Sequence, residues 1–307
     1  MNQPARAIGI DIGGTKIAVA AIDESGAILA RTTIATEAEL GFDRAIVRMT
    51  EAADRVLEQA GWSRSDLRGV GIGCTGPVNA ERGIINNPYT LPTWIDCDIV
   101  TRLRAVFDRP VYLENDADAA ALGEWFAGSG RGCRQIVMLT LGTGVGGGAV
   151  IEGQVFRGTR GEHPELGHIP IDSGGPDCYC GMPGCLESIA SGTAIAAAGR
   201  DIGLKGSREV FLEAAQGAPE ALAILERMRW ALGRATWTIL HTFMPELIVL
   251  GGGIIDEHYE LFAPAVESQI PLATMVPRGG TRVAKASLGN EAGIVGAASL
   301  VLRHSGQ

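Results

Sequence analysis

Three cysteines and one histidine stand close together in the sequence, in a combination that could bind a metal ion. The cysteines are Cys178, Cys180 and Cys185, and His168 precedes them. Three thiolates and one imidazole suit a closed tetrahedral zinc site, which would be structural because no position stays open for a substrate. We therefore predict that zinc holds the irregular segment 153–187 in shape. The alternative is that the cysteines are free thiols in a loop.

Glycine-rich turns follow three segments that have the pattern of buried strands. Glycine lets backbone N–H groups come within hydrogen-bonding distance of a phosphate, which a Cβ atom would prevent. One such turn would indicate only a tight hairpin, whereas three predict a nucleotide site. Thr15, Lys16 and Thr143 could add donors, and no turn has the spacing of a Rossmann motif or a P-loop. The turns are Asp11-Ile-Gly-Gly-Thr-Lys16, Leu141-Gly-Thr-Gly-Val-Gly-Gly-Gly148 and Leu250-Gly-Gly-Gly253.

A further polar group, Glu114-Asn-Asp-Ala-Asp118, marks the point where a predicted strand ends and a predicted helix over 117–127 begins. Asp116 could cap the N-terminus of that helix. It could instead be a general base that takes a proton from an alcohol attacking a γ-phosphate, since phosphoryl transfer needs such a group beside phosphate-binding turns. The residues by themselves leave both roles open.

The elements that must position these groups follow from the hydrophobic pattern. A strand, a glycine turn and a second strand are predicted over 8–22, and the same succession returns over 136–151. Apolar residues at steps of three and four predict helices over 42–60 and within 193–242, and a final helix over 292–303. The repeated succession predicts a duplicated α/β domain.

Composition limits the possible functions. At 307 residues the chain is long enough for two domains, and 46% hydrophobic with 20% charged residues excludes a disordered protein. A formal net charge of −9 gives no electrostatic reason to bind nucleic acid or an anionic membrane. We find neither a transmembrane stretch nor a signal-peptide core, and therefore expect a cytoplasmic protein.

Together these motifs resemble the ROK family of sugar kinases, within the actin/hexokinase/Hsp70 ATPase superfamily. They span the whole chain in the family's order. The residues that carry the resemblance are Asp11-Ile-Gly-Gly-Thr-Lys16, Glu114-Asn-Asp-Ala, Leu141-Gly-Thr-Gly-Val-Gly-Gly-Gly148, Glu165-Leu-Gly-His168 and Cys178-Tyr-Cys-Gly-Met-Pro-Gly-Cys-Leu-Glu187.

The resemblance implies an α/β fold of two actin-like (ribonuclease H-like) domains around a cleft. The N-terminal domain would cover 1–117 and be joined by the C-terminal helix, 292–307. The larger C-terminal domain would cover 118–291 and carry the zinc-bound loop, 153–187.

The resemblance also implies roles for individual residues. Asp116 would be the catalytic base and Asn115 a sugar ligand, while Glu165, His168 and Glu187 would bind sugar hydroxyls. His168 would be the fourth zinc ligand as well, so that the metal orients its ring.

The same resemblance assigns the nucleotide site. The first two glycine turns would bind the phosphates of ATP, the third would lie on the adenosine side, and Asp11 would lie close to Mg²⁺ through water. The residues assigned to the nucleotide are Asp11, Gly13, Gly14, Thr15, Lys16, Gly142, Thr143, Gly144, Gly251, Gly252 and Gly253.

Two positions depart from the family pattern. Family glucokinases often have Pro-Asn-Leu-Pro-Gly-Trp, and the matching stretch, Asn87-Pro-Tyr-Thr-Leu-Pro-Thr-Trp94, puts Thr90 at the place of the sugar-binding Asn. Asp118 stands where Asn is common. Its carboxylate would raise the pKa of Asp116 if the two are close, and otherwise it points away along the helix.

The expected activity is an ATP-dependent hexose kinase that phosphorylates the 6-hydroxyl of glucose, and homodimers are common in the family. The alternatives within the class are N-acetylglucosamine, N-acetylmannosamine, mannose and fructose kinases. Polyphosphate could be the donor, although no basic run marks a polyanion track. The opposing class is a sugar-responsive regulator, which we disfavour because the segment before Asp11 is too short for a helix-turn-helix module.

Overall fold

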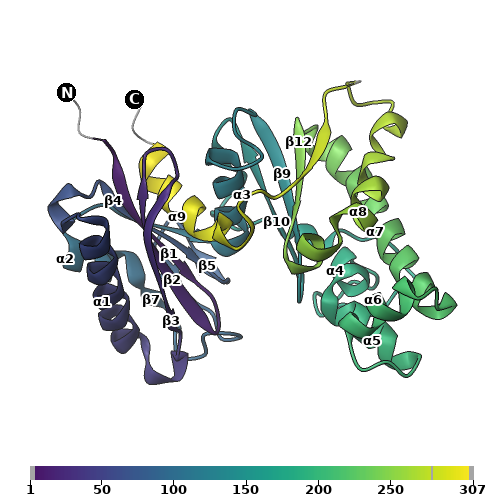
Figure 1. The fold of residues 1–307 in the computed structure, drawn as a ribbon, viewed down its shortest axis with the longest axis horizontal. Helices are drawn as coiled ribbons and strands as arrows, with labels where there is room; N and C mark the ends of the chain where they lie inside the picture. The colour runs from purple at the N-terminus through teal and green to yellow at the C-terminus, as the bar shows by residue number, and fades with distance from the viewer. Residues whose placement is uncertain (1–3, 278, 304–307) are drawn as a thin grey trace. The chain divides into compact units, whose positions relative to one another are not determined.

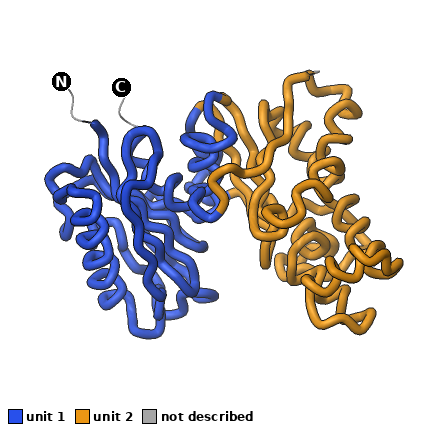
Figure 2. Tube along the Cα trace, in the orientation of Figure 1, with its two compact units in different colours: residues 1–132, 153–163, 290–307 blue, residues 133–152, 164–289 orange. Residues whose placement is uncertain are grey.

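The computed structural model describes residues 4–277 and 279–303. The chain forms two compact units, coloured separately in Figure 2. Apart from the undescribed positions, unit 1 comprises 1–132, 153–163 and 290–307, and unit 2 comprises 133–152 and 164–289. Among the described residues no helix is both long enough and apolar enough to span a bilayer. The domain boundary expected after residue 117 stays a prediction.

Unit 1 is built on a mixed five-stranded sheet in the order β3-β2-β1-β4-β8. The first three strands are antiparallel neighbours, and β4 and β8 continue the sheet parallel to β1. Residues 8–12 and 70–74 are almost fully apolar or glycine, as expected for strands that are covered on both faces. The strands are β1 (Arg6–Ile12), β2 (Lys16–Asp23), β3 (Ile28–Ala35), β4 (Gly69–Cys74) and β8 (Val111–Asn115).

Helices pack against this sheet, and one of them begins directly after β8 ends. The C-terminal helix α9 packs against α3 and against β1 and β4 (Figure 1). Small residues make the approach close, since a Cβ atom added at Gly296 would lie 1.6 Å from the carbonyl oxygen of Ala119. The helices are α1 (Phe42–Ala60), α2 (Ile99–Phe107), α3 (Asp116–Phe126) and α9 (Ala292–Leu302), and a small antiparallel sheet is formed by β5 (Val78–Asn79), β6 (Ile84–Ile85) and β7 (Cys97–Asp98).

The second mixed sheet has the order β11-β10-β9-β12-β13, of which β9, β10, β12 and β13 belong to unit 2. Its β9–β10 hairpin is antiparallel, and β12 and β13 run parallel to β9, which repeats the arrangement of the first sheet. The predicted α/β class is therefore confirmed. The strands are β9 (Gln135–Leu141), β10 (Val145–Ile151), β11 (Gln154–Val155), β12 (Leu247–Gly251) and β13 (Arg282–Lys285).

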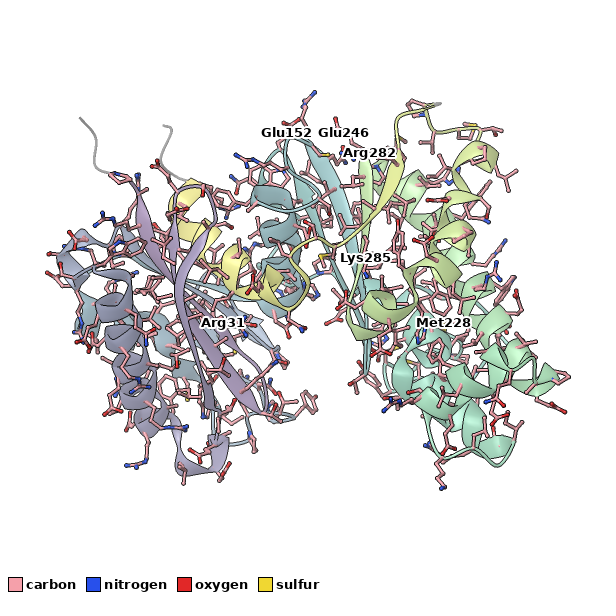
Figure 3. The ribbon with its side chains drawn as sticks, in the orientation of Figure 1. Arg31, Glu152, Met228, Glu246, Arg282 and Lys285 are labelled. Carbon is pink, nitrogen blue, oxygen red and sulfur yellow. The ribbon has the colours of Figure 1, made fainter. Side chains whose placement is uncertain are left out.

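Charged side chains link the chain segments at one end of the second sheet. Arg134 forms an ion pair with Glu152, and its backbone N–H donates to the Glu246 carboxylate at 2.7 Å. Glu152 and Glu246 are labelled near each other in Figure 3, with Arg282 close by. The second and third glycine turns lie at the other end of β9 and β12, beyond Leu141 and Gly251.

The predicted helical region 193–242 consists of three helices. The long helix α7 buries residues such as Met228, labelled in Figure 3, in the core of unit 2. The breaks come at glycines with positive φ, Gly203 and Gly217, which are αL positions that glycine adopts without strain. The helices of unit 2 are α4 (Leu186–Ala190), α5 (Gly192–Asp201), α6 (Ser207–Ala215), α7 (Pro219–Phe243) and α8 (Gly253–Glu267), and the 3-10 helices of the chain are Ala38–Leu40, Arg64–Asp66, Leu166–His168, Ile270–Leu272 and Gly289–Glu291.

Candidate active site

Asn115 and Asp116 lie where β8 ends and α3 begins. Asn115 is the N-cap of α3, because its Oδ1 accepts from the N–H of Ala117 at 2.8 Å and from that of Asp118 at 3.3 Å. Asp116 is the first helical residue, and its Oδ1 also accepts from Ala117, at 2.9 Å. The capping role considered for Asp116 therefore belongs mainly to Asn115, which leaves the Asp116 carboxylate available for chemistry.

The electrostatic environment of Asp116 has opposing components. Burial raises the pKa of Asp116, whereas the hydrogen bond from Ala117 and the nearby His163 lower it, and Asp118 raises it slightly. A base needs to be ionised and yet basic enough to take a proton from an alcohol, and this balance provides both properties.

Asp11 faces the same region from the end of β1. Burial, followed by repulsion from Asp116, raises the pKa of Asp11 to about 6, while Lys16 lowers it. A Cβ atom at Gly293, in the first turn of α9, would lie 3.1 Å from the Asp11 carboxyl carbon, so glycine is what leaves room for this side chain. Two neighbouring carboxylates that repel each other suit a hard divalent cation, and Asp11 therefore fits the predicted place beside Mg²⁺.

A second layer of buried charge lies behind Asp116. Asp118 is 1% exposed and its Oδ2 lies 2.8 Å from Nδ1 of His163. Glu114, also buried, pairs with Arg157, and burial together with Asp118 raises the pKa of Glu114. Asp118 thus pairs with His163 and also contributes to the raised pKa of Asp116. Sequence reasoning missed His163 and Arg157, which lie in a loop with no local motif to mark them.

The first glycine turn joins β1 to β2. The N–H of Gly13 donates to the carbonyl of Lys16 at 3.0 Å, and the Thr36 hydroxyl donates to the carbonyl of Gly13 at 2.7 Å. Thr15 and Lys16 are exposed at this turn. The Thr36 hydroxyl therefore stabilises the turn, and Thr15 and Lys16 remain accessible to solvent.

Thr90 lies against this turn. A Cβ atom at Gly14 would lie 3.2 Å from the Cβ of Thr90. The Thr90 hydroxyl accepts from Nδ2 of Asn87 at 2.7 Å, and Asn87 is fully buried. Asn87 also accepts from the N–H of Thr90 at 3.0 Å, so it orders the segment that carries Thr90. No role was predicted for Asn87.

The second glycine turn joins β9 to β10 in unit 2. The N–H of Gly142 donates to the carbonyl of Gly144 at 2.9 Å, and the N–H of Gly192, at the start of α5, donates to the carbonyl of Gly142 at 2.7 Å. Glu187 contacts the turn directly, because its Oε2 accepts from the N–H of Val145 at 2.8 Å. The predicted sugar ligand Glu187 therefore also supports a predicted phosphate-binding turn.

The third glycine turn leads from β12 into α8. Gly252 has φ of +89°, and a Cβ atom there would lie 2.5 Å from the carbonyl oxygen of Leu141. Only glycine is compatible with that backbone angle and that close contact. The predicted nucleotide residues Gly251, Gly252 and Gly253 therefore lie beside the end of β9, where the second turn starts.

The predicted zinc ligands are brought together. The ligand atoms of His168, Cys178, Cys180 and Cys185 all lie within 4.8 Å of one another. Nδ1 of His168 lies 3.4 Å from the Cys178 sulfur. The S₃N donor set suits zinc in kind, and the His168–Cys178 and Cys180–Cys185 separations, both 3.4 Å, are compatible with a shared tetrahedral ion.

The other ring nitrogen of His168 lies 3.1 Å from the hydroxyl of Tyr179, which sequence reasoning did not single out although it stands between two cysteines. Glu165, the last predicted sugar ligand, is exposed and begins the 3-10 turn that contains His168. The predicted sugar ligands are divided between the units, with Thr90, Asn115 and Asp116 in unit 1 and Glu165, His168 and Glu187 in unit 2.

Comparisons with known proteins agree over nearly the whole chain. Residues 7–304 match the model of the ROK family. A glucokinase of Thermotoga maritima is 38% identical over 315 residues, which cover 97% of this chain and 98% of that protein.

Two solved structures are also similar. The ROK hexokinase from Thermus thermophilus superposes with a TM-score of 0.84 at 34% identity, covering 95% of this chain and 96% of that one. A ROK family glucokinase from Streptomyces griseus, in complex with glucose and AMPPNP, superposes with a TM-score of 0.73 at 30% identity, covering 96% and 99%.

Proposed function

Because the chain belongs to the ROK family, within the actin/hexokinase/Hsp70 ATPase superfamily, and is a sugar kinase, we propose that it transfers the γ-phosphoryl group of ATP to the 6-hydroxyl of glucose. The observation that carries this proposal is the placement of Asp116, a largely buried carboxylate at the end of β8 that the N-cap leaves free and that lies near Asp11. The glucokinase names of similar proteins support glucose as the acceptor.

In the proposed reaction, Asp116 accepts the proton of the sugar hydroxyl while that oxygen forms a bond to the γ-phosphorus. The bond between this phosphorus and the β–γ bridging oxygen breaks, and ADP leaves. The Ala117 hydrogen bond and His163 keep the Asp116 carboxylate ionised before the step, and burial makes it more basic. Asn115 stays fixed by its capping bonds and presents its amide nitrogen beside Gly76.

The nucleotide is assigned to the glycine turns. Backbone N–H groups there, with Thr15, Lys16 and Thr143, would contact the phosphates of ATP, and 251–253 would lie on the adenosine side. Asp11 would hold Mg²⁺ through water. A bound Mg²⁺ would neutralise charge on the phosphate oxygens during transfer.

The zinc ligands have a positioning role in this proposal. With Nδ1 of His168 on the metal, the ring would be held in place, and its Nε2, which lies 3.1 Å from the Tyr179 hydroxyl, would exchange that contact for a sugar hydroxyl. Cys178, Cys180 and Cys185 would complete a structural site. Glu165 and Glu187 would add carboxylate acceptors for other hydroxyls.

The direct test measures ADP release with Mg-ATP and one sugar at a time: glucose, mannose, fructose, N-acetylglucosamine or N-acetylmannosamine. A strong response to glucose and a weaker one to mannose would support the proposal and show that Thr90 tolerates glucose. Activity only with an acetylated or keto sugar would keep the mechanism and replace the substrate. Silence on the whole panel, with polyphosphate also tried as donor, would contradict the proposed reaction.

We also propose that the protein is a homodimer. Helix α7 presents large exposed apolar side chains on one face, among them Trp230 and Trp237, which are 46% and 39% exposed. Exposed tryptophans at such a spacing are typical of an interface between subunits. Light scattering after size-exclusion chromatography should give twice the chain mass, and Trp230→Glu should reduce it to the monomer. A monomeric unmodified protein would contradict this proposal.

A further inference from the structure

A hollow of about 480 Å³ opens in unit 1, apart from the glycine turns and Asp116. Its walls come from α2, from β8 and from the turn between β5 and β6. Its charged side chains are strongly biased towards one sign, with Glu81 as the single acid among the lining residues. The lining arginines are Arg82, Arg104, Arg157 and Arg303.

These arginines have uneven pairing. Arg157 pairs with Glu114, and Nη1 of Arg303 donates to the carbonyl of Gly153. Nε of Arg303 is buried and has no hydrogen-bond partner within 4–277 and 279–303. Arg82 and Arg104 are exposed, and in the same described ranges their side chains make no hydrogen bond or ion pair. The hollow therefore has more cationic donors than acceptors.

The arginines around the hollow lack enough negatively charged partners among the described residues to balance their positive charge. Burial lowers the pKa of Arg303, and the neighbouring Arg157 acts in the same direction, against Glu114. A guanidinium group presents several N–H donors in one plane and matches the oxygens of a phosphoryl group. An oxyanion in the hollow would pair with the exposed guanidinium groups of Arg82 and Arg104 and reduce the repulsion among the arginines.

We propose that this hollow binds a small molecule that carries a phosphoryl group. The volume lies in the range of small-molecule pockets. The chain's net charge of −9 makes the hollow a local exception and argues against an extended polyanion such as nucleic acid. Arg82 and Arg104 would make the direct contacts, and Arg157 and Arg303 would add positive charge to the lining.

Binding of an anion in the hollow would affect the proposed reaction centre through one ion pair. Arg157 lines the hollow and also pairs with the buried Glu114, which precedes Asn115 and Asp116 on β8. An anion that binds Arg157 would weaken the ion pair between Arg157 and Glu114. The electrostatic potential at Asp116 would then change. This second step rests on the proposed role of Asp116, whereas binding in the hollow does not.

The test uses inorganic phosphate as the probe, with AMPPNP and glucose saturating, at constant ionic strength. Phosphate binding is followed by ³¹P line broadening in the unmodified protein, in Arg82→Gln/Arg104→Gln and in Arg102→Gln. Arg102 lies on the same helix but pairs with Asp43 and does not line the hollow, so it is the matched control. We expect phosphate affinity to fall about tenfold or more in the double variant and to be unchanged in the control.

A second arm replaces phosphate by glucose 6-phosphate under the same conditions. Tighter binding than that of phosphate, lost in the double variant, would identify an organic phosphate as the ligand, and equal affinity would identify the free anion. Phosphate affinity that is the same in all three proteins would overturn the proposal, as would the absence of phosphate binding to the unmodified protein when AMPPNP and glucose are saturating. Because none of these readouts requires turnover, they remain valid if the chain phosphorylates another sugar.

Discussion

His163 and Asp118 form a buried pair behind the proposed base, with His163 Nδ1 at 2.8 Å from Asp118 Oδ2. Asp118 is 1% exposed, and Glu114 lies close enough for Asp118 to raise its pKa. Asp11, Asp116, Glu114 and Asp118 thus concentrate negative charge at one end of the sheet of unit 1. His163 and Arg157 are the basic side chains that pair with these carboxylates and offset their negative charge.

The first prediction concerns this pair. His163→Ala removes a positive charge that lowers the pKa of Asp116, so that pKa should rise. Because the ionised base is the active form, the acid limb of the pH profile of kcat should move to higher pH. Asp118 would also be left buried without its partner, which should cost about 3 kcal/mol in the free energy of unfolding. Activity from pH 5 to 9 and urea unfolding measure the two effects.

A double variant separates the effects of charge and packing. His163→Ala/Asp118→Asn removes both charges, so it should recover much of the lost stability and return the acid limb towards its original position. If the double variant is as unstable as His163→Ala, packing rather than charge explains the role of His163.

The second prediction tests Asp116 as the base. Asp116→Asn keeps the size of the side chain but cannot accept the proton, so kcat should fall by about 10²–10⁴-fold while glucose still binds. Burial raises the pKa of Asp116 and so disfavours its charged form, and the variant should be at least as stable as the unmodified protein at pH 7. Asp54→Asn, at an exposed pair with Arg64, is the control. Turnover within twofold of the unmodified protein would rule out Asp116 as the base.

The third prediction follows from Asp11, whose pKa of about 6 lies above the ordinary aspartate value of 3.8. The folded protein holds this proton more tightly than the unfolded chain. The resulting stabilisation is therefore complete below about pH 4 and is lost as the pH rises through 6. The shift corresponds to about 3 kcal/mol. In Asp11→Asn this pH-dependent contribution should disappear. The unfolding free energy of the variant minus that of the unmodified protein should therefore increase from pH 4 to 7.

Magnesium provides the complementary measurement for Asp11. Added Mg²⁺ should raise the stability of the unmodified protein at pH 7 more than that of Asp11→Asn, since the variant lacks one carboxylate. Equal gains in both proteins would show that Asp11 does not contribute to the cation site.

Local patterns predicted much of the fold. The strands that flank the first two glycine turns are mostly apolar, and a run such as 136–141 needs no distant partner to be recognised. The cysteine cluster was equally local, and the structure brings its ligand atoms together. Features set by long-range packing were not predictable. The contact of Gly296 with Ala119 depends on α9 returning to α3, which no local pattern records.

The candidate site shows the same division. The β8–α3 junction was located from Glu114-Asn-Asp-Ala-Asp118, yet the cap is Asn115 because its side chain reaches two N–H groups of α3. The pairing of Asp118 with His163 joins residues from distant parts of the sequence, and a histidine in an irregular loop has no periodicity to mark it. Sequence spacing therefore located the polar residues but could not predict the partners that set their pKa values.

The fourth prediction concerns the Cys/His cluster. Cys180→Ser should lose zinc and thermal stability together, because we assign the four clustered side chains to one ion. Cys97→Ser is the control, since this half-buried thiol lies in the small sheet of unit 1 and outside the cluster. Elemental analysis and thermal unfolding with and without a chelator measure both effects. Full zinc content in Cys180→Ser would show that the ligand set is different.

The last prediction separates the two roles of the second glycine turn. A Cβ atom at Gly144 would lie 2.6 Å from Oε2 of Glu187, whereas one at Gly142 would have no atom within 4 Å. Gly144→Ala should therefore displace Glu187 and raise KM for both glucose and ATP. Gly142→Ala should fold normally and raise KM for ATP alone, because its methyl group would occupy space that we assign to a phosphate. Steady-state kinetics with each substrate varied distinguish the variants, and an unchanged KM for glucose in Gly144→Ala would remove Glu187 from the sugar site.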